Sequence, residues 1–152
     1  MALHFEQVYT VIEYYDGPRE GVADFGSAPH MYRSCAMDAE PWDPDDTRFL
    51  LWPISGAALK LALEEWAIWR RWEDAFHAGL VDESTHPALP DDRPRYEELA
   101  AQLTAAVREN QAHAIIATGE FRAKQPVPNT PRGILYPLEV RWSLVESVPP
   151  AI

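Results

Sequence analysis

The chain has 152 residues, of which 47% are hydrophobic and 11% aromatic, and this size and composition fit one folded domain and exclude general disorder. Its formal net charge of −11 argues against a general role in binding nucleic acid, because the phosphates would be repelled. No apolar run approaches about 18 residues, so we expect no membrane-spanning helix. The single cysteine, Cys35, permits no internal disulfide, and the N-terminus lacks the basic-then-apolar order of a secretory signal, so we expect a cytoplasmic protein.

The first third of the chain predicts strands. Residues 5–15, FEQVYTVIEYY, are rich in valine, isoleucine, threonine and aromatics, which favour a strand, and residues 16–21 form a turn cluster. Two short strands follow, at residues 22–25 and 29–35, joined at Gly26-Ser27, so an antiparallel meander is predicted. Residues 36–47 contain two prolines and five acids and predict a surface loop, and the apolar run 48–54 predicts a further strand.

Residues 55–79 predict a long helix that carries three of the six tryptophans. Ser55 can accept hydrogen bonds from the free N–H groups of the first turn, and Gly79 can adopt the left-handed conformation that ends a helix. The spacing of Trp66, Trp69 and Trp72 spreads them around the helix, which predicts a helix covered on more than one side. We therefore expect these indoles to be buried beneath a curved sheet, with this helix as the core.

The last part of the chain predicts one more helix and two strands. Asp91 or Asp92 is expected to cap a helix over residues 93–110, whose apolar residues form one stripe. Residues 113–124 predict a strand. Residues 133–146 alternate strictly between apolar and polar positions and predict another strand, with Pro137 indicating an edge or a bulge. The tail, residues 147–152, is expected to be loose.

Together these elements predict a single α+β domain over residues 1–152. Its strands fall at 5–54 and 112–146 and its helices at 55–79 and 93–110. The expected architecture is a mainly antiparallel sheet of about six strands, packed on the long tryptophan-rich helix and a second amphipathic helix.

One segment resembles a known sequence pattern. The residues that carry it are Tyr14-Tyr15-Asp16-Gly17-Pro18-Arg19, then Gly21, Ala23-Asp24, Gly26 and Pro29-His30. This segment is similar to a pattern found in small uncharacterised bacterial proteins. The resemblance implies a bacterial source, and it implies no activity and no catalytic residue.

The first candidate binding site lies in the same region and consists of Tyr15, Asp16, Arg19, Asp24 and His30. Carboxylates, a guanidinium and an imidazole on adjoining strands can hold a polar or anionic ligand, and Asp24 can orient His30 for proton transfer. The alternative is structural: Asp16 caps its turn, Arg19 pairs with a nearby acid, and His30 begins a strand.

Metal-binding patterns are weak. The acid loop has five carboxylates, the hard ligands that calcium prefers, but it lacks the spacing of an EF-hand loop and is expected to be a solvated loop. Its acids are Asp38, Glu40, Asp43, Asp45 and Asp46. The five histidines, His4, His30, His77, His86 and His113, lack the paired spacing of a zinc site. We predict no metal and no cofactor.

Catalytic motifs are not apparent in the sequence. There is no G-x-S-x-G motif and no glycine-rich phosphate loop, and Cys35 has no histidine neighbour along the chain. Glu65 and Glu73 project near the tryptophan side of the long helix, where a dry carboxylate would have a raised pKa. The alternative is that each pairs with an arginine, such as Arg19, Arg122 or Arg141.

Three functions follow from these observations. The favoured hypothesis is a small acidic binding protein that acts on a protein partner or a second copy of itself, with Trp42 and Trp52 as interface anchors. The second hypothesis is an enzyme or a small-ligand protein with a pocket near Asp16–His30. The third is an immunity-type protein that masks a basic toxin such as a nuclease, which only the charge supports.

Overall fold

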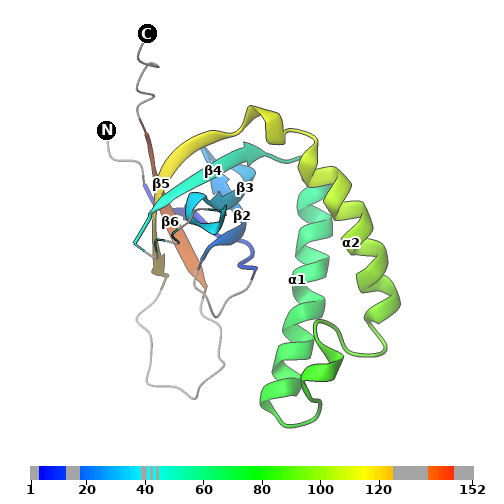
Figure 1. Cartoon of the computed structure of the whole chain (residues 1–152). Helices are drawn as coiled ribbons and strands as arrows, with labels where there is room; N and C mark the ends of the chain where they lie inside the picture. The colour runs from blue at the N-terminus through cyan, green and yellow to red at the C-terminus, as the bar shows by residue number, and fades with distance from the viewer. Residues whose placement is uncertain are drawn as a thin grey trace.

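The computed structural model describes residues 4–12, 18–38, 41, 43, 45–124 and 137–145. It contains an α+β domain, as predicted, in which two helices pack against a six-stranded antiparallel sheet (Figure 1). The strands are β1 (Glu6–Gln7), β2 (Glu20–Phe25), β3 (Ala28–Ser34), β4 (Arg48–Pro53), β5 (Ile115–Ala123) and β6 (Leu138–Leu144). The helices are α1 (Gly56–His77) and α2 (Arg93–Arg108), and short 3-10 turns lie at Cys35–Asp38, Glu83–Thr85 and Gln111–His113.

The sheet has the strand order β1-β6-β5-β4-β3-β2 with every pair antiparallel. The predicted meander is present in β2 and β3, whose tight turn has φ of 61° at Gly26 and 65° at Ser27. Positive φ at both central residues matches the right-handed twist of the strands it joins. β6 lies between β1 and β5, so the expectation of an edge strand at Pro137 is wrong: this proline precedes the strand, where its missing N–H costs no ladder bond.

The N-terminal segment closes the sheet on itself. After β1 pairs with β6, the same segment pairs with β2 through bridges from Val8 to Ala23 and from Ile12 to Glu20. The amide of Tyr9 donates to the carbonyl of Val22 at 2.8 Å. One stretch of chain therefore joins both ends of the strand order.

The main core lies inside this closed sheet. Four aromatic rings meet there, those of Tyr32, Phe49, Phe121 and Trp142. The separations between their centroids are 5.4–6.1 Å. Trp142 is fully buried, and its indole N–H donates to the carbonyl of Asp24 at 3.0 Å. The expectation that the tryptophan-rich helix forms the core is therefore wrong, because a sheet that closes on itself packs its own concave face.

The two helices form a hairpin beside the sheet (Figure 1). Ser55 caps α1 as predicted, its hydroxyl accepting from the amide of Ala58 at 3.0 Å, and Gly79 has a φ of 76° after the last turn. Asp92 is the N-cap residue of α2, one of the two positions predicted, but its side chain makes no capping hydrogen bond, and Arg71 of α1 binds its carboxylate with two hydrogen bonds of 3.0 Å. No helix in the described part of the chain is long and apolar enough to cross a membrane.

Trp52 of β4 connects the helix hairpin to the sheet, at the end of the hairpin where α1 begins and α2 ends. This residue is 3% exposed, and its indole N–H donates to the carbonyl of Val107 in α2 at 2.6 Å. Trp52 is thus a core residue, and its predicted role as an interface anchor is wrong; Trp42 lies outside the described residues. Beyond this contact the helices diverge from the strands, so Trp66 and Trp69 are only partly buried.

Candidate functional site

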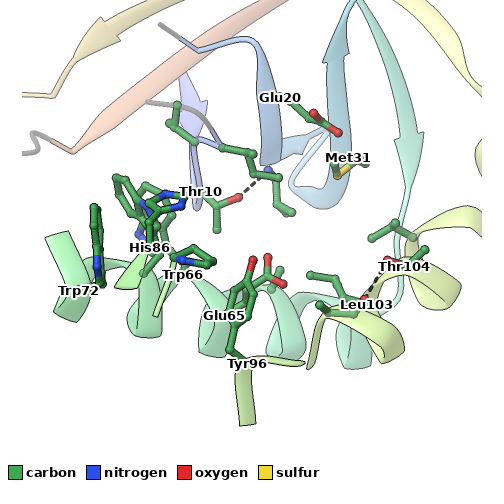
Figure 2. Close-up of a pocket in the computed structure, with 18 of the residues that line it drawn as sticks. Thr10, Glu20, Met31, Glu65, Trp66, Trp72, His86, Tyr96, Leu103 and Thr104 are labelled. Atoms are coloured by element: carbon green, nitrogen blue, oxygen red, sulfur yellow. Dashed lines mark hydrogen bonds between the residues drawn. The ribbon is translucent and has the colours of Figure 1, made fainter. Parts of the chain in front are cut away.

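A cavity of about 1020 Å³ lies between the helix hairpin and the outer face of the closed sheet (Figure 2). Its floor consists of aromatic residues of α1 together with residues of α2. Its opposite wall comes from the N-terminal segment and from β2 and β3, through Thr10, Val11, Ile12, Val22 and Met31. The helices are distant in sequence from the N-terminal segment, β2 and β3, and the closure of the sheet brings these segments together.

The aromatic floor follows from helical spacing. Residues three and four apart lie on neighbouring turns, so their rings can stack. Trp66 and Trp69 stack with centroids 5.1 Å apart and an interplanar angle of 23°, and Trp72 and Phe76 stack at 5.1 Å and 15°. These two stacked pairs give the cavity an apolar lining of four aromatic side chains.

The connector between the helices closes one end of the cavity. The buried Trp72 donates from its indole N–H to the hydroxyl of Thr85 at 2.8 Å, and the ring of His86 meets it edge-on at 4.6 Å. The connector therefore buries Trp72, rather than the sheet as expected. Arg93 of α2 holds this end in place by donating to the carbonyl of Thr85 at 2.9 Å.

The wall of strands is fixed by close backbone contacts. The hydroxyl of Thr10 accepts from the amide of Val22 at 2.9 Å, and Val22 lies opposite Met31 in the β2–β3 register. At Gly21 a Cβ atom would lie 2.2 Å from the carbonyl oxygen of Thr10. Only a residue without a side chain allows the N-terminal segment this close.

Two polar groups project from the helices into the cavity. Figure 2 shows the carboxyl of Glu65 beside the phenol of Tyr96, both directed toward the strands. Burial raises the pKa of Glu65. Burial is also the main cause of the raised pKa of Tyr96, and the nearby Glu65 adds to it.

Other ionisable groups lie in the cavity lining or next to it. A carboxylate oxygen of Glu20 lies 3.6 Å from a guanidinium nitrogen of Arg33 on the neighbouring strand. The Nε2 atom of His77 lies 3.7 Å from a carboxylate oxygen of the buried Glu73. The expected alternative that Arg122 or Arg141 neutralises Glu65 or Glu73 is wrong, since these arginines pair with Glu139 and Glu120 between β5 and β6.

The residues predicted as a binding site are not gathered around this cavity. Tyr15 and Asp16 lie outside the described residues. Arg19, Asp24 and His30 are not among the lining residues. Asp24 lies opposite Pro29 in the register and accepts from the hydroxyl of Tyr9 at 3.1 Å, whereas His30 packs edge-on against Phe25 at 5.2 Å. Because adjacent residues of a strand point to opposite faces, Asp24 and His30 are not brought together.

Carboxylates of the acid loop accept hydrogen bonds within local turns. Glu40 and the side chain of Asp38 lie outside the described residues. Asp43 accepts from the amide of Asp45 at 2.9 Å, and Asp46 binds Arg48, which lowers the pKa of Asp46 to about 2. Within the described residues, no group of three or more histidines, cysteines and acids can hold a metal ion.

The predicted histidines and the cysteine are scattered. His4 and His113 are exposed at separate places, and His77 and His86 lie at the far end of the helix hairpin. Burial raises the pKa of the Cys35 thiol, which disfavours the thiolate that a nucleophile requires.

Comparison of the chain with protein-family models, with curated proteins and with solved structures finds no match. The resemblance carried by residues 14–30 therefore stays a prediction.

The sequence indicated part of the cavity only. It placed Glu65 near the tryptophans with a raised pKa, and the structure agrees. It assigned Tyr96 to the apolar stripe of α2, although this tyrosine also lines the cavity. The wall formed by Thr10, Val22 and Met31 gave no sequence signal, because it depends on the closure of the sheet.

Proposed function

We propose that this protein binds a hydrophobic small molecule in the cavity between the helix hairpin and the sheet. The observation that carries the proposal is the stacked pair Trp66 and Trp69, which lines the cavity and stays only partly buried. Large aromatic groups are costly to leave in contact with water, and a ligand that covers them recovers that cost.

The size and chemistry of the cavity support this proposal. Ligand pockets typically have volumes of about 300–1,000 Å³, with mainly apolar and aromatic walls and a few polar groups. The volume of about 1020 Å³ lies at the upper end of that range, and Thr10, Glu65 and Tyr96 supply polar groups. A ligand of about 20 non-hydrogen atoms at roughly 0.3 kcal/mol per atom would bind with a dissociation constant near 40 µM, as an order-of-magnitude estimate.

The test uses the neutral fluorescent probe N-phenylnaphthylamine, which brightens in apolar surroundings. We expect it to bind the wild-type chain and to quench tryptophan emission, and we expect Ala100→Trp to abolish binding by filling the cavity. Ala101→Trp is the matched control, since Ala101 is exposed on α2 and Ala100 lines the cavity.

Circular dichroism and thermal unfolding should show that both variants are folded. No binding to the folded wild-type chain would overturn the proposal. Equal binding by Ala100→Trp and wild type would also overturn it, because the probe would then sit elsewhere.

A further inference from the structure

We propose that the ligand of this cavity is a hydrophobic organic cation, an amine or a quaternary ammonium, whose charge lies between Glu65 and the indoles of α1. The inference rests on the proposed function and adds the charge of the ligand to it.

The first observation is that Glu65 has no partner within the described part of the chain. It lines the cavity and is partly buried, yet it takes part in no hydrogen bond or ion pair with a described residue. A carboxylate that is partly withdrawn from water and has no partner loses part of its hydration, and a buried charge is normally paired. A cation supplied by the ligand would complete this pairing.

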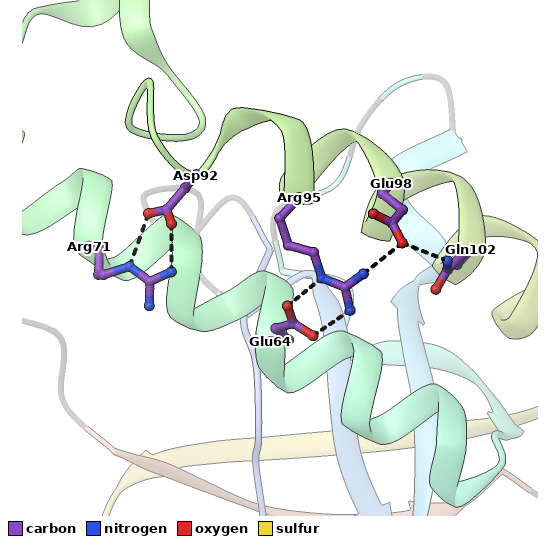
Figure 3. Close-up of polar contacts among 6 residues, drawn as sticks. All are labelled: Glu64, Arg71, Asp92, Arg95, Glu98 and Gln102. Atoms are coloured by element: carbon purple, nitrogen blue, oxygen red, sulfur yellow. Dashed lines mark hydrogen bonds and ion pairs between the residues drawn. The ribbon is translucent and has the colours of Figure 1, made fainter.

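The neighbouring glutamate shows that partners are available nearby. Figure 3 shows Glu64, one position earlier on α1, bound by Arg95 of α2 through hydrogen bonds of 2.6 and 2.7 Å. Arg71 is likewise engaged by Asp92. These arginines join the two helices away from the cavity, so neither reaches Glu65.

The second observation is the sign of charge around the cavity. Its described lining contains the carboxylates of Glu20, Glu65 and Glu83 and two histidines, but no lysine or arginine. Of the three carboxylates, that of Glu20 is paired with Arg33 of the neighbouring strand. The net charge of the chain is −11, which attracts cations from a distance and repels anions. A fatty acid or another apolar anion is therefore disfavoured.

The third observation is the aromatic floor. The face of an indole ring carries negative electrostatic potential and attracts ammonium groups, most strongly when water is excluded. The stack of Trp66 and Trp69 lines the same cavity as Glu65. Aromatic rings and one carboxylate are the groups that recognise an alkylated ammonium, whose charge is spread over apolar surface.

The experiment compares three molecules with one scaffold and different charge: naphthylmethylamine, naphthylmethanol and naphthoate, each displacing N-phenylnaphthylamine. For wild type we expect the amine to bind at least about tenfold more tightly than the alcohol, and naphthoate to bind most weakly. Glu65→Gln should reduce the preference for the amine over the alcohol to about twofold or less. Glu64→Gln is the control: Glu64 is the neighbouring residue on α1 and is bound by Arg95, so this substitution should leave the preference unchanged.

Each outcome decides one point. Equal binding of amine and alcohol to wild type would overturn the inference while leaving the proposed function intact. Failure of the probe itself to bind would overturn the proposed function. If the preference survives in a folded Glu65→Gln variant, the assignment of Glu65 as the charge partner is wrong.

Discussion

At the scale of single residues, two adjacent glutamates on α1 have opposite environments. Glu64 is exposed and held by Arg95, which lowers its pKa, whereas Glu65 faces the cavity and burial raises its pKa. Adjacent positions on a helix differ by about 100° in direction, so neighbours in sequence can lie on different faces. A carboxylate that has no partner among the described residues and is kept in such a position is a cost to stability that binding can recover.

We predict that Glu65→Gln stabilises the ligand-free protein, with a dependence on pH. Because the folded-state pKa of Glu65 is raised, the wild-type chain loses stability as pH rises through that pKa. Thermal midpoints should therefore be higher for Glu65→Gln near pH 7 and should converge with wild type below about pH 4, where both side chains are neutral. The other ionisable groups lining the cavity are Glu20, His77, Glu83, His86 and Tyr96.

The control for this prediction is Glu97→Gln, since Glu97 is exposed on α2. It should leave the midpoint nearly unchanged at both pH values. A midpoint for Glu65→Gln below that of wild type near neutral pH would show that the carboxylate stabilises the fold.

At the scale of elements, local sequence signals predicted most of the structure. The helix ends at Ser55 and Gly79 and the turn at Gly26-Ser27 each depend on one or two residues, and all three are confirmed. At Asp92 the position of the cap is confirmed, but the side chain binds Arg71 of the other helix instead of the amides of the first turn. Local signals gave no indication that residues 6–12 pair with both β6 and β2, since register is set by tertiary contacts.

We predict that Gly21→Ala destabilises the fold by about 1–3 kcal/mol or more, because its Cβ would clash with the backbone of Thr10. Urea unfolding followed by circular dichroism measures the change. Gly56→Ala is the control: nothing lies near that position in the first turn of α1, so it should be neutral or slightly stabilising. Equal stability of the two variants would show that the N-terminal segment is not held closely against β2.

At the scale of the whole molecule, the main core and the candidate site lie on different sides of the sheet and meet at Val11 and Trp66. The core surrounds Trp142 inside the closed sheet, whereas Val11 belongs to the core and also lines the cavity, and Trp66 packs against the core while it lines the cavity. Aromatic content alone could not predict this division, because both regions are rich in aromatic residues. Which indole is enclosed depends on how the sheet closes, and that depends on pairings between distant segments.

The different burial of Trp142 and Trp66 predicts different effects of the same substitution. Trp142→Phe should cost about 1–3 kcal/mol of unfolding free energy, because it leaves a gap in the core and removes the hydrogen bond to Asp24. Trp66→Phe should cost less than about 1 kcal/mol but weaken binding of N-phenylnaphthylamine. Urea unfolding and probe titration measure the two effects, and a larger loss of stability for Trp66→Phe would place the core on the helix.

The double pairing of the N-terminal segment has a consequence for solubility. Open strand edges offer unpaired N–H and C=O groups to other chains, a common route to aggregation. Here a single segment covers the flank of β6 at Glu6–Gln7 and the flank of β2 from Val8 to Ile12. Loss or displacement of this one segment would expose the edges of β6 and β2 together. Its attachment therefore opposes self-association of the protein through strand pairing.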